Sequence, residues 1–231
     1  NLPGFITGNG NLQVTSGISS GLWTGSGADA NWSTAGNWDN NAVPIFPHAL
    51  TFAGDAGLIN NNDLSGITVG SFTFDAAAGA FVIGGNDITL SGGLGFNGNP
   101  SSPVTQTINL NMAWTSAETI NTPTNGNFSL GGNINSGNSL TKTGAGALAL
   151  GGYDSFSDFV LNGGTTTITG NVTVSGTGSS LFYLGNGNVN YNGTLVIQPG
   201  ATFNVTGDWT DAGVIGRDGG VATVIQNGGT F

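Results

Sequence analysis

The chain has 231 residues, of which 37 % are hydrophobic and only 6 % are charged, and it has no cysteine. A disordered chain would ordinarily carry far more charge, so we expect a folded protein with a real core. The net charge of −10 comes from 12 acidic against two basic residues. This balance excludes nucleic acid and anionic membrane surfaces as partners, because both require clustered Lys and Arg. No apolar run approaches 18 residues, so we expect no transmembrane segment in this chain.

The first 20 residues read as a strand or linker segment. The stretch "NLPGFITGNGNLQVTSG" contains the strand-like run Leu12–Val14 between Gly- and Asn-rich turns. Such a segment could add a strand to the sheet edge of a neighbouring molecule. We therefore treat residues 1–20 as a candidate donor strand.

Residues 21–60 form a tryptophan-rich segment with two interpretations. Trp23, Trp32 and Trp38 stand on a polar, Gly-rich background, so their rings could be a platform on which sugars stack. Alternatively, the rings pack a loop against the end of the fold and cap it, since each offers a large area to bury. The nearby Phe46, between Pro44 and Pro47, favours packing.

From residue 61 onward the chain shows many short strands separated by turns. "TQTINLNMAWT" alternates Ile108, Leu110, Met112 and Trp114 with polar residues, a half-buried strand pattern. Shorter pairs repeat the alternation: Phe72 and Phe74, Ile88 and Leu90, Val172 and Val174, Val189 and Tyr191, Phe203 and Val205. Gly and Asn clusters between them are typical of turns, and no helical pattern of ten residues is present. The chain is therefore expected to be all-β.

Repeated motifs indicate stacked coils. "VLNGGTTTITG" (160–170), "VIQPGATFNVTG" (196–207) and "VIQNGGTF" (224–231) share an apolar pair, a turn and a second strand. The interval between the first and second motifs suits two coils, and the interval between the second and third motifs suits one coil carrying an insertion. We predict a right-handed parallel β-helix over residues 61–231, with coils of roughly 18–25 residues that end within a repeat. A β-sandwich is the alternative, but it would show hairpin pairs with two-residue loops.

The stretch "SLTKTGAGALALGG" (139–152) fits this fold as a closely stacked rung. Neighbouring strands lie about 4.8 Å apart, and small residues avoid clashes at the corners between them. Asn and Thr at equivalent positions of successive coils can form hydrogen-bonded ladders along the stack. Such ladders would order a surface that has little charge.

A family resemblance rests on the same region. "LTKTGAGALALGGYDSFSDFVLNGGTTTITGN" resembles the autotransporter-associated β-strand repeat through Leu140, Lys142, Gly144, Gly146, Leu148, Leu150, Gly152, Asn162, Gly164 and Thr165. The loop "YDSFSDF" departs from the usual Asn-Thr-Tyr-x-Gly. The resemblance implies a large β-helix of bacterial origin, secreted or held at the cell surface, and implies no particular chemistry.

The residues suited to chemistry are few. Glu118 is the only glutamate, whereas glycoside hydrolysis ordinarily needs a facing pair of carboxylates. His48 lies in "PIFPHAL" and reads as a packed loop residue. Arg217 stands among Asp208, Asp211 and Asp218, which suggests a salt bridge or, as the alternative, a calcium site of oxygen ligands. "NNND" (60–63) is a second calcium candidate. We expect no catalytic residue and no cofactor, with calcium as the one candidate ligand.

Two function classes follow from the sequence. The first is a non-enzymatic extracellular structural protein, a stiff subunit of a surface or secreted fibre that associates end to end with other copies of itself. The second is an adhesin or polysaccharide-binding module, with the solenoid face or the tryptophan segment as its surface. A polysaccharide-degrading enzyme is the weaker alternative.

Overall fold

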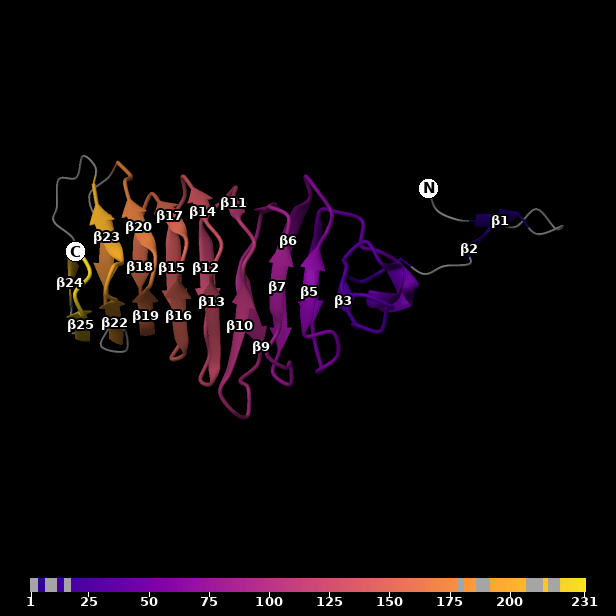
Figure 1. The fold of residues 1–231 in the computed structure, drawn as a ribbon, viewed down its shortest axis with the longest axis horizontal. Helices are drawn as coiled ribbons and strands as arrows, with labels where there is room; N and C mark the ends of the chain where they lie inside the picture. Colours follow the sequence, from indigo (N-terminus) through magenta and orange to yellow (C-terminus); the bar gives the residue numbers. More distant parts are fainter. Residues whose placement is uncertain are drawn as a thin grey trace.

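The computed structural model describes residues 4–6, 12–14, 18–177, 181–185, 192–206, 214–215 and 221–231. Its strands stand side by side along the long axis of the molecule (Figure 1). The described residues contain no α-helix; the only helical turns are the 3-10 helices η1 (Ala35–Asn37) and η2 (Asp39–Asn41). The predicted all-β class is confirmed.

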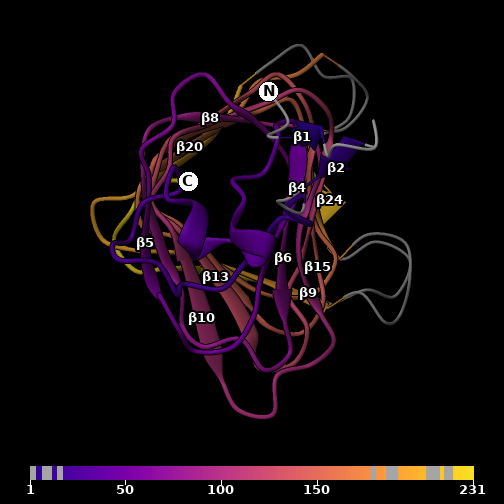
Figure 2. The ribbon, with the colours of Figure 1, turned by 90° about the vertical axis from the view of Figure 1, so that its right-hand side faces the viewer.

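Three faces of parallel strands enclose one interior (Figure 2). The face named here the β7 face consists of β5 (Ile59–Asn62), β7 (Val82–Gly85), β10 (Val104–Ile108), β13 (Gly126–Leu130), β16 (Ala147–Leu150), β19 (Gly164–Ile168), β22 (Asn192–Ile197) and β25 (Val221–Gln226). The β8 face consists of β8 (Ile88–Leu90), β11 (Met112–Trp114), β14 (Ile134–Ser136), β17 (Tyr153–Phe156), β20 (Asn171–Val174) and β23 (Thr202–Val205). The β9 face consists of β9 (Leu94–Asn97), β12 (Glu118–Asn121), β15 (Leu140–Thr143), β18 (Phe159–Leu161), β21 (Phe182–Leu184) and β24 (Val214–Ile215).

The long strand β6 (Thr68–Asp75) joins two of these faces. Its first half pairs with β8 and its second half with β9. On its other side it pairs with β4 (His48–Phe52), which pairs in turn with β3 (Leu22–Trp23). The tryptophan-rich segment therefore continues the same sheet. The strands β1 (Gly4–Ile6) and β2 (Leu12–Val14) form a separate antiparallel pair.

The chain returns to an equivalent place once per coil. On the β8 face, bonded residues of successive coils are separated by 24, 22 and 20 positions. These lengths lie within the predicted range, whereas the last coils are longer: Asn171 pairs with Thr202 and Thr194 with Thr223, 31 and 29 positions apart. The parallel β-solenoid expected from the repeats is confirmed, but the predicted coil length of roughly 18–25 residues is wrong for these last coils. Residues that are neighbours in space are thus one coil apart in sequence, and each face carries columns of stacked side chains.

Apolar columns fill the interior. Along the β7 face one column runs Ile83, Ile108, Leu130, Leu150, Ile168 and Ile197, each fully buried. Aromatic rings stack in the same way near both ends, for example Phe159 on Phe182 with centroids 6.1 Å apart. Each such side chain contributes about 1.5–3 kcal/mol by leaving water. No single coil could bury these residues alone, because each is covered by the coils above and below.

Two details differ from the sequence expectations. The alternating run that reads as one strand is split into β10 and β11, because the chain turns a corner at residues 109–111 while Leu110 still points into the core. The motif at Val160 is also not equivalent to the other two. Val160 lies on the β9 face, whereas Val196 pairs with Ile225 on the β7 face one coil later. The first interval therefore does not span two coils, whereas the second spans one coil, as expected. The segment predicted as an insertion in that coil contains β24, a regular strand that pairs with β21, and its other residues lie outside the described ranges.

The small residues of the stretch 139–152 are required by close backbone approach. Gly144 has φ +83° and ends β15 at a corner. A Cβ at Gly146 would lie 2.1 Å from the carbonyl oxygen of Gly126 in the preceding coil. The stretch is a rung in which side chains larger than hydrogen do not fit at these positions.

Candidate binding surface

The three leading tryptophans are inside the structure. Trp23, Trp32 and Trp38 are at most 1 % exposed, and Trp38 meets both other rings edge-on with centroids 5.1 and 6.0 Å away. Trp38 Nε1 donates to the carbonyl oxygen of Trp32 at 2.7 Å. No ring face is open to a sugar, so the stacking platform finds no support here. Packing at the end of the solenoid accounts for these residues.

Polar side chains tie this segment to the first coil. Trp32 Nε1 donates to Asn60 Oδ1 at 2.8 Å, and Ser33 bonds to the carboxylate of Asp63. Asn61 Nδ2 donates to Asn31 Oδ1 at 3.0 Å. The "NNND" stretch suggested as a calcium candidate is thus occupied by hydrogen bonds that hold the end of the solenoid together.

The other residues proposed for chemistry are not gathered into a site. Asp208, Asp211, Asp218 and Arg217 lie outside the described residues. Within the described ranges, no group of three or more His, Asp or Glu could hold a metal ion. Glu118 is 3 % exposed and accepts from Ser116 Oγ at 2.9 Å; burial raises the pKa of its carboxyl. Its partners along the column are Leu140 and Phe159, so no second carboxylate stands beside it there. His48 is half-buried, with Nδ1 2.8 Å from the carbonyl oxygen of Ala49.

Lys142 is an internal cation. It occupies a column between Ile120 and Leu161 and is fully buried. Its Nζ donates to three carbonyl oxygens, those of Thr143 at 3.2 Å, Gly144 at 2.9 Å and Gly163 at 2.7 Å. Burial lowers the pKa of Lys142 to about 8, while the three oxygens act against that shift by stabilising the ammonium. The lysine therefore joins the corners of two successive coils.

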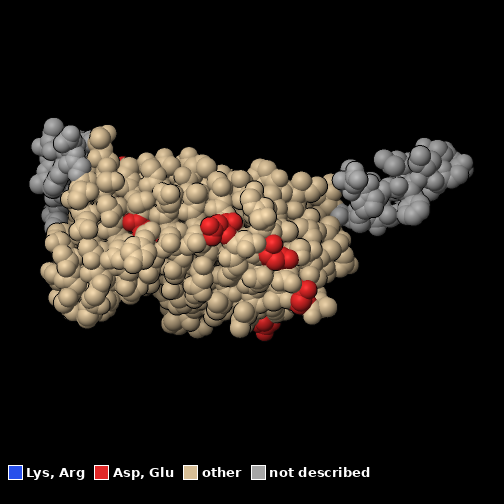
Figure 3. Space-filling view, turned by 45° about the horizontal axis from the view of Figure 1, so that its top comes forward, with Lys and Arg blue, Asp and Glu red and all other residues tan. Residues whose placement is uncertain are grey.

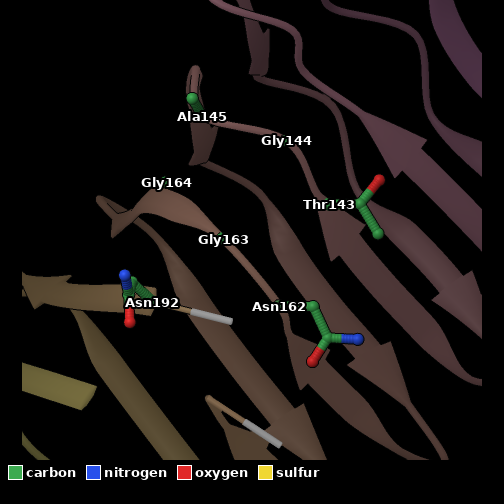
Figure 4. Close-up of a pocket in the computed structure, with 7 residues that line it drawn as sticks. All are labelled: Thr143, Gly144, Ala145, Asn162, Gly163, Gly164 and Asn192. Carbon is green, nitrogen blue, oxygen red and sulfur yellow. The ribbon is translucent and has the colours of Figure 1, made fainter. Parts of the chain in front are cut away.

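A hollow of about 380 Å³ lies over this corner (Figure 4). Its lining is uncharged: Thr143, Gly144, Ala145, Asn162, Gly163, Gly164 and Asn192. A Cβ at Gly164 would lie 2.8 Å from Lys142 Nζ, so glycine leaves room for the ammonium. The buried Asn162 Oδ1 accepts no hydrogen bond from the described residues. The glycine backbone that lines this hollow serves the lysine contact, which is a structural role.

A polar row runs along the outer edge of the β8 face, one residue before β8, β11 and β14 and at the first residue of β17. It is called here the amide row and consists of Asp87, Asn111, Asn133 and Tyr153. Asn111 Nδ2 donates to Asp87 Oδ1 at 2.9 Å, and Asn111 Oδ1 accepts from the backbone N–H of Asn133 at 2.9 Å. Asn133 Oδ1 accepts from the backbone N–H of Tyr153 at 2.9 Å. The ladder predicted for Asn at equivalent positions is confirmed. All four residues are exposed, Tyr153 by 74 %.

A second hollow, of about 300 Å³, lies along this row. Its lining residues are Asp87, Ile88, Asn111, Met112, Ala113, Asn133 and Asn135. The small side chain of Ala113 stands between longer neighbours, since it pairs with Thr89 on one side and Asn135 on the other. The hollow thus has a short apolar floor and polar walls.

The surface of the described part of the solenoid is acidic and otherwise neutral. Figure 3 shows Asp and Glu spread along the solenoid, with no Lys or Arg visible on this side. The lysine of the described region is buried. Cationic or neutral ligands are therefore favoured over anionic ones. No helix of the described region is long and apolar enough to cross a membrane.

The chain is similar in sequence to a known adhesin. It is 27 % identical over 197 residues, 81 % of its length, to "Adhesin BmaC autotransporter" of Brucella suis biovar 1 (strain 1330). The chain spans about 5 % of that protein's length. No family model matches, and no solved structure matches. The similarity and the solenoid fold bear out the resemblance drawn from the repeat motifs, and together they support an adhesin-like surface β-helix.

Proposed function

We propose that this chain is a non-enzymatic segment of an extracellular, surface-exposed β-solenoid, and that it binds external targets as an adhesin does. One observation carries the proposal: the β8 face is an ordered polar surface, held by side chain to backbone bonds from coil to coil. The likeness to an autotransporter adhesin supports the location and the role. The dispersed Glu118, His48 and aspartates of the described region support a role without catalysis.

A stiff scaffold suits this role. The interior columns and the parallel strands lock each coil to the next, so the outer side chains keep fixed spacings along the rod. A surface that is ordered before binding loses little conformational entropy when a ligand docks on it. The solenoid is thus a rigid scaffold that presents a repetitive binding face.

Adhesion of coated beads tests the proposal. Polystyrene beads carrying the full chain should adhere to at least one of a panel of mammalian, plant and bacterial cells, and excess soluble chain should block the adhesion. Beads coated with serum albumin are the control. Adhesion no greater than that of the albumin beads on every cell type would contradict the proposal.

End-to-end association into a fibre is a second proposal, supported by the N-terminal strands. β1 and β2 pair only with each other within the described structure, so each has a main-chain edge available for strand addition. Deleting residues 1–17 should then convert oligomers into folded monomers in sedimentation velocity. A full chain that sediments as a monomer at high concentration would refute it.

A further inference from the structure

The amide row leaves specific polar groups available to a ligand. Asn111 uses both ends of its carboxamide within the row, toward Asp87 and toward Asn133. Asn133 uses only its Oδ1, and Asn135 Oδ1 accepts from Ser155 Oγ at 3.5 Å. Within the described structure the Nδ2 groups of both remain as donors, and Asp87 keeps one carboxylate oxygen as an acceptor. Two amide donors and an acceptor therefore surround the hollow over Ala113.

An exposed aromatic ring follows in the same row. Tyr153 lies one coil beyond Asn133, to whose Oδ1 its backbone N–H donates. The Tyr153 side chain is 74 % exposed, although aromatic side chains of this solenoid are mostly in the core. The exposed ring lies one coil from ordered amides and offers an apolar face to a ligand.

These groups together match the chemistry of a sugar chain. Sugar hydroxyls both donate and accept hydrogen bonds, and the carbon-bound hydrogens on one side of the ring pack on aromatic faces. Successive coils lie about 4.8 Å apart, close to the advance of one sugar in an extended β-linked chain. A polysaccharide lying along the solenoid axis could thus meet one coil per sugar.

We propose that the hollow over Ala113 and the ring of Tyr153 form a continuous binding site for a neutral polysaccharide, lying along the amide row. Tyr153 stacks on one sugar, Asn133 and Asn135 bond the hydroxyls of the next, and Asp87, two coils further along the row, bonds those of a later sugar. Asp87 and the overall charge of −10 disfavour uronic-acid and sulfated chains. The inference rests on the proposed adhesive function and names the ligand class and the residues.

Binding to defined sugars tests the site. The full chain is titrated by calorimetry with hexasaccharides of β-1,4-glucose, β-1,3-glucose and β-1,4-mannose, and with oligoalginate and heparin hexasaccharide as anionic probes. At least one neutral hexasaccharide should bind saturably, and the anionic ones should bind at least tenfold more weakly. Tyr153→Ala should weaken binding roughly tenfold or more, as expected for loss of an aromatic contact. Tyr153→Phe should keep most of the affinity, and Asn135→Ala should lose several-fold.

Thr119→Ala is the matched control, because Thr119 is an exposed polar residue on the β9 face. It should leave both affinity and melting temperature unchanged, and the other variants should melt as the wild type does. Equal affinity of Tyr153→Ala and wild type, or preference for anionic chains, would overturn the site. If no neutral sugar binds but the beads still adhere, the polysaccharide inference fails and the adhesive function stands. If neither binds, both fail.

Discussion

Asp154 is a buried carboxyl whose ionisation should destabilise the protein above neutral pH. It lies on β17 and is 3 % exposed. β14 and β17 share only the pair Asn135 and Ser155, and Asp154 Oδ1 accepts the backbone N–H of Ile134 at 2.9 Å. Its other oxygen is buried and has no partner in the described structure. Burial raises the pKa of Asp154 from 3.8 to about 7, with the Ile134 bond acting in the opposite direction.

The sign and size of this effect on the free energy of unfolding follow from the linkage between proton binding and folding. The folded state holds the proton more tightly than the unfolded state, so the free energy of unfolding falls as the pH rises from 3.8 to about 7. Below this window both states are protonated, and above it both are ionised, so the contribution is level there. At about 1.4 kcal/mol per pH unit, the ionised carboxyl costs at most about 4 kcal/mol above pH 7.

Asp154→Asn should remove this cost while keeping an oxygen for Ile134. We expect the free energy of unfolding at pH 8 to rise by about 2–4 kcal/mol. Between pH 4 and 7 we expect that free energy to depend less steeply on pH, by up to the equivalent of one proton. Guanidinium denaturation at a series of pH values measures both. Glu118 contributes a slope of the same sign, because burial also raises its pKa. The difference between variant and wild type isolates Asp154.

The matched control is Asp55→Asn, the same change at an exposed position, which should alter stability by no more than about 0.5 kcal/mol. If Asp154→Asn changes neither the free energy of unfolding at pH 8 nor its pH dependence between pH 4 and 7, the carboxyl is not desolvated and the reasoning is refuted.

Other variants test the corner contacts and the calcium alternative. Lys142→Met should cost about 2–4 kcal/mol in denaturant unfolding, because the carbonyls of the two coils lose their donor; unchanged stability would contradict the internal-cation role. Gly146→Ala should cost more than 2 kcal/mol by clash with the preceding coil, whereas Gly137→Ala, with nothing within 4 Å of its Cβ, should stay within about 0.5 kcal/mol; equal effects would count against close stacking. If the aspartates of residues 208–218 form a salt bridge with Arg217, calorimetric melting should be identical in Ca²⁺ and in EDTA, and a rise with Ca²⁺ would instead support a metal site.

The fold could be predicted from the sequence because its signal is local and repeated. Short alternating runs, Gly and Asn corners and small residues at the rung all describe one coil, and the next coil repeats them. Corners are harder to place, since inward residues such as Leu110 keep the alternation through a turn. The sequence places the motif at Val160 wrongly for the same reason, because similar corners recur on different faces of one coil.

The candidate site could be predicted only in part. Asn ladders follow from repetition, but no local pattern shows that Asn133 and Tyr153 share a row, since coil lengths vary. Asp154 carries a signal that could have been used: it is a polar residue aligned with the apolar Val172 of the next coil. For the tryptophans the sequence favours packing without excluding a platform, because burial is decided by what the next coil covers.

Labelling of single cysteines tests most directly whether the β8 face contacts the target. The chain has no cysteine, so one can be introduced at Asn135, at Thr119 on the β9 face or at Ile59 on the β7 face, all exposed. Each full-length variant is bound to adherent cells and then treated with a maleimide dye. We predict that bound protein is protected at residue 135 and labelled at residues 119 and 59 at the rate of unbound protein. Protection at residue 119 or 59, with residue 135 labelled freely, would contradict the account.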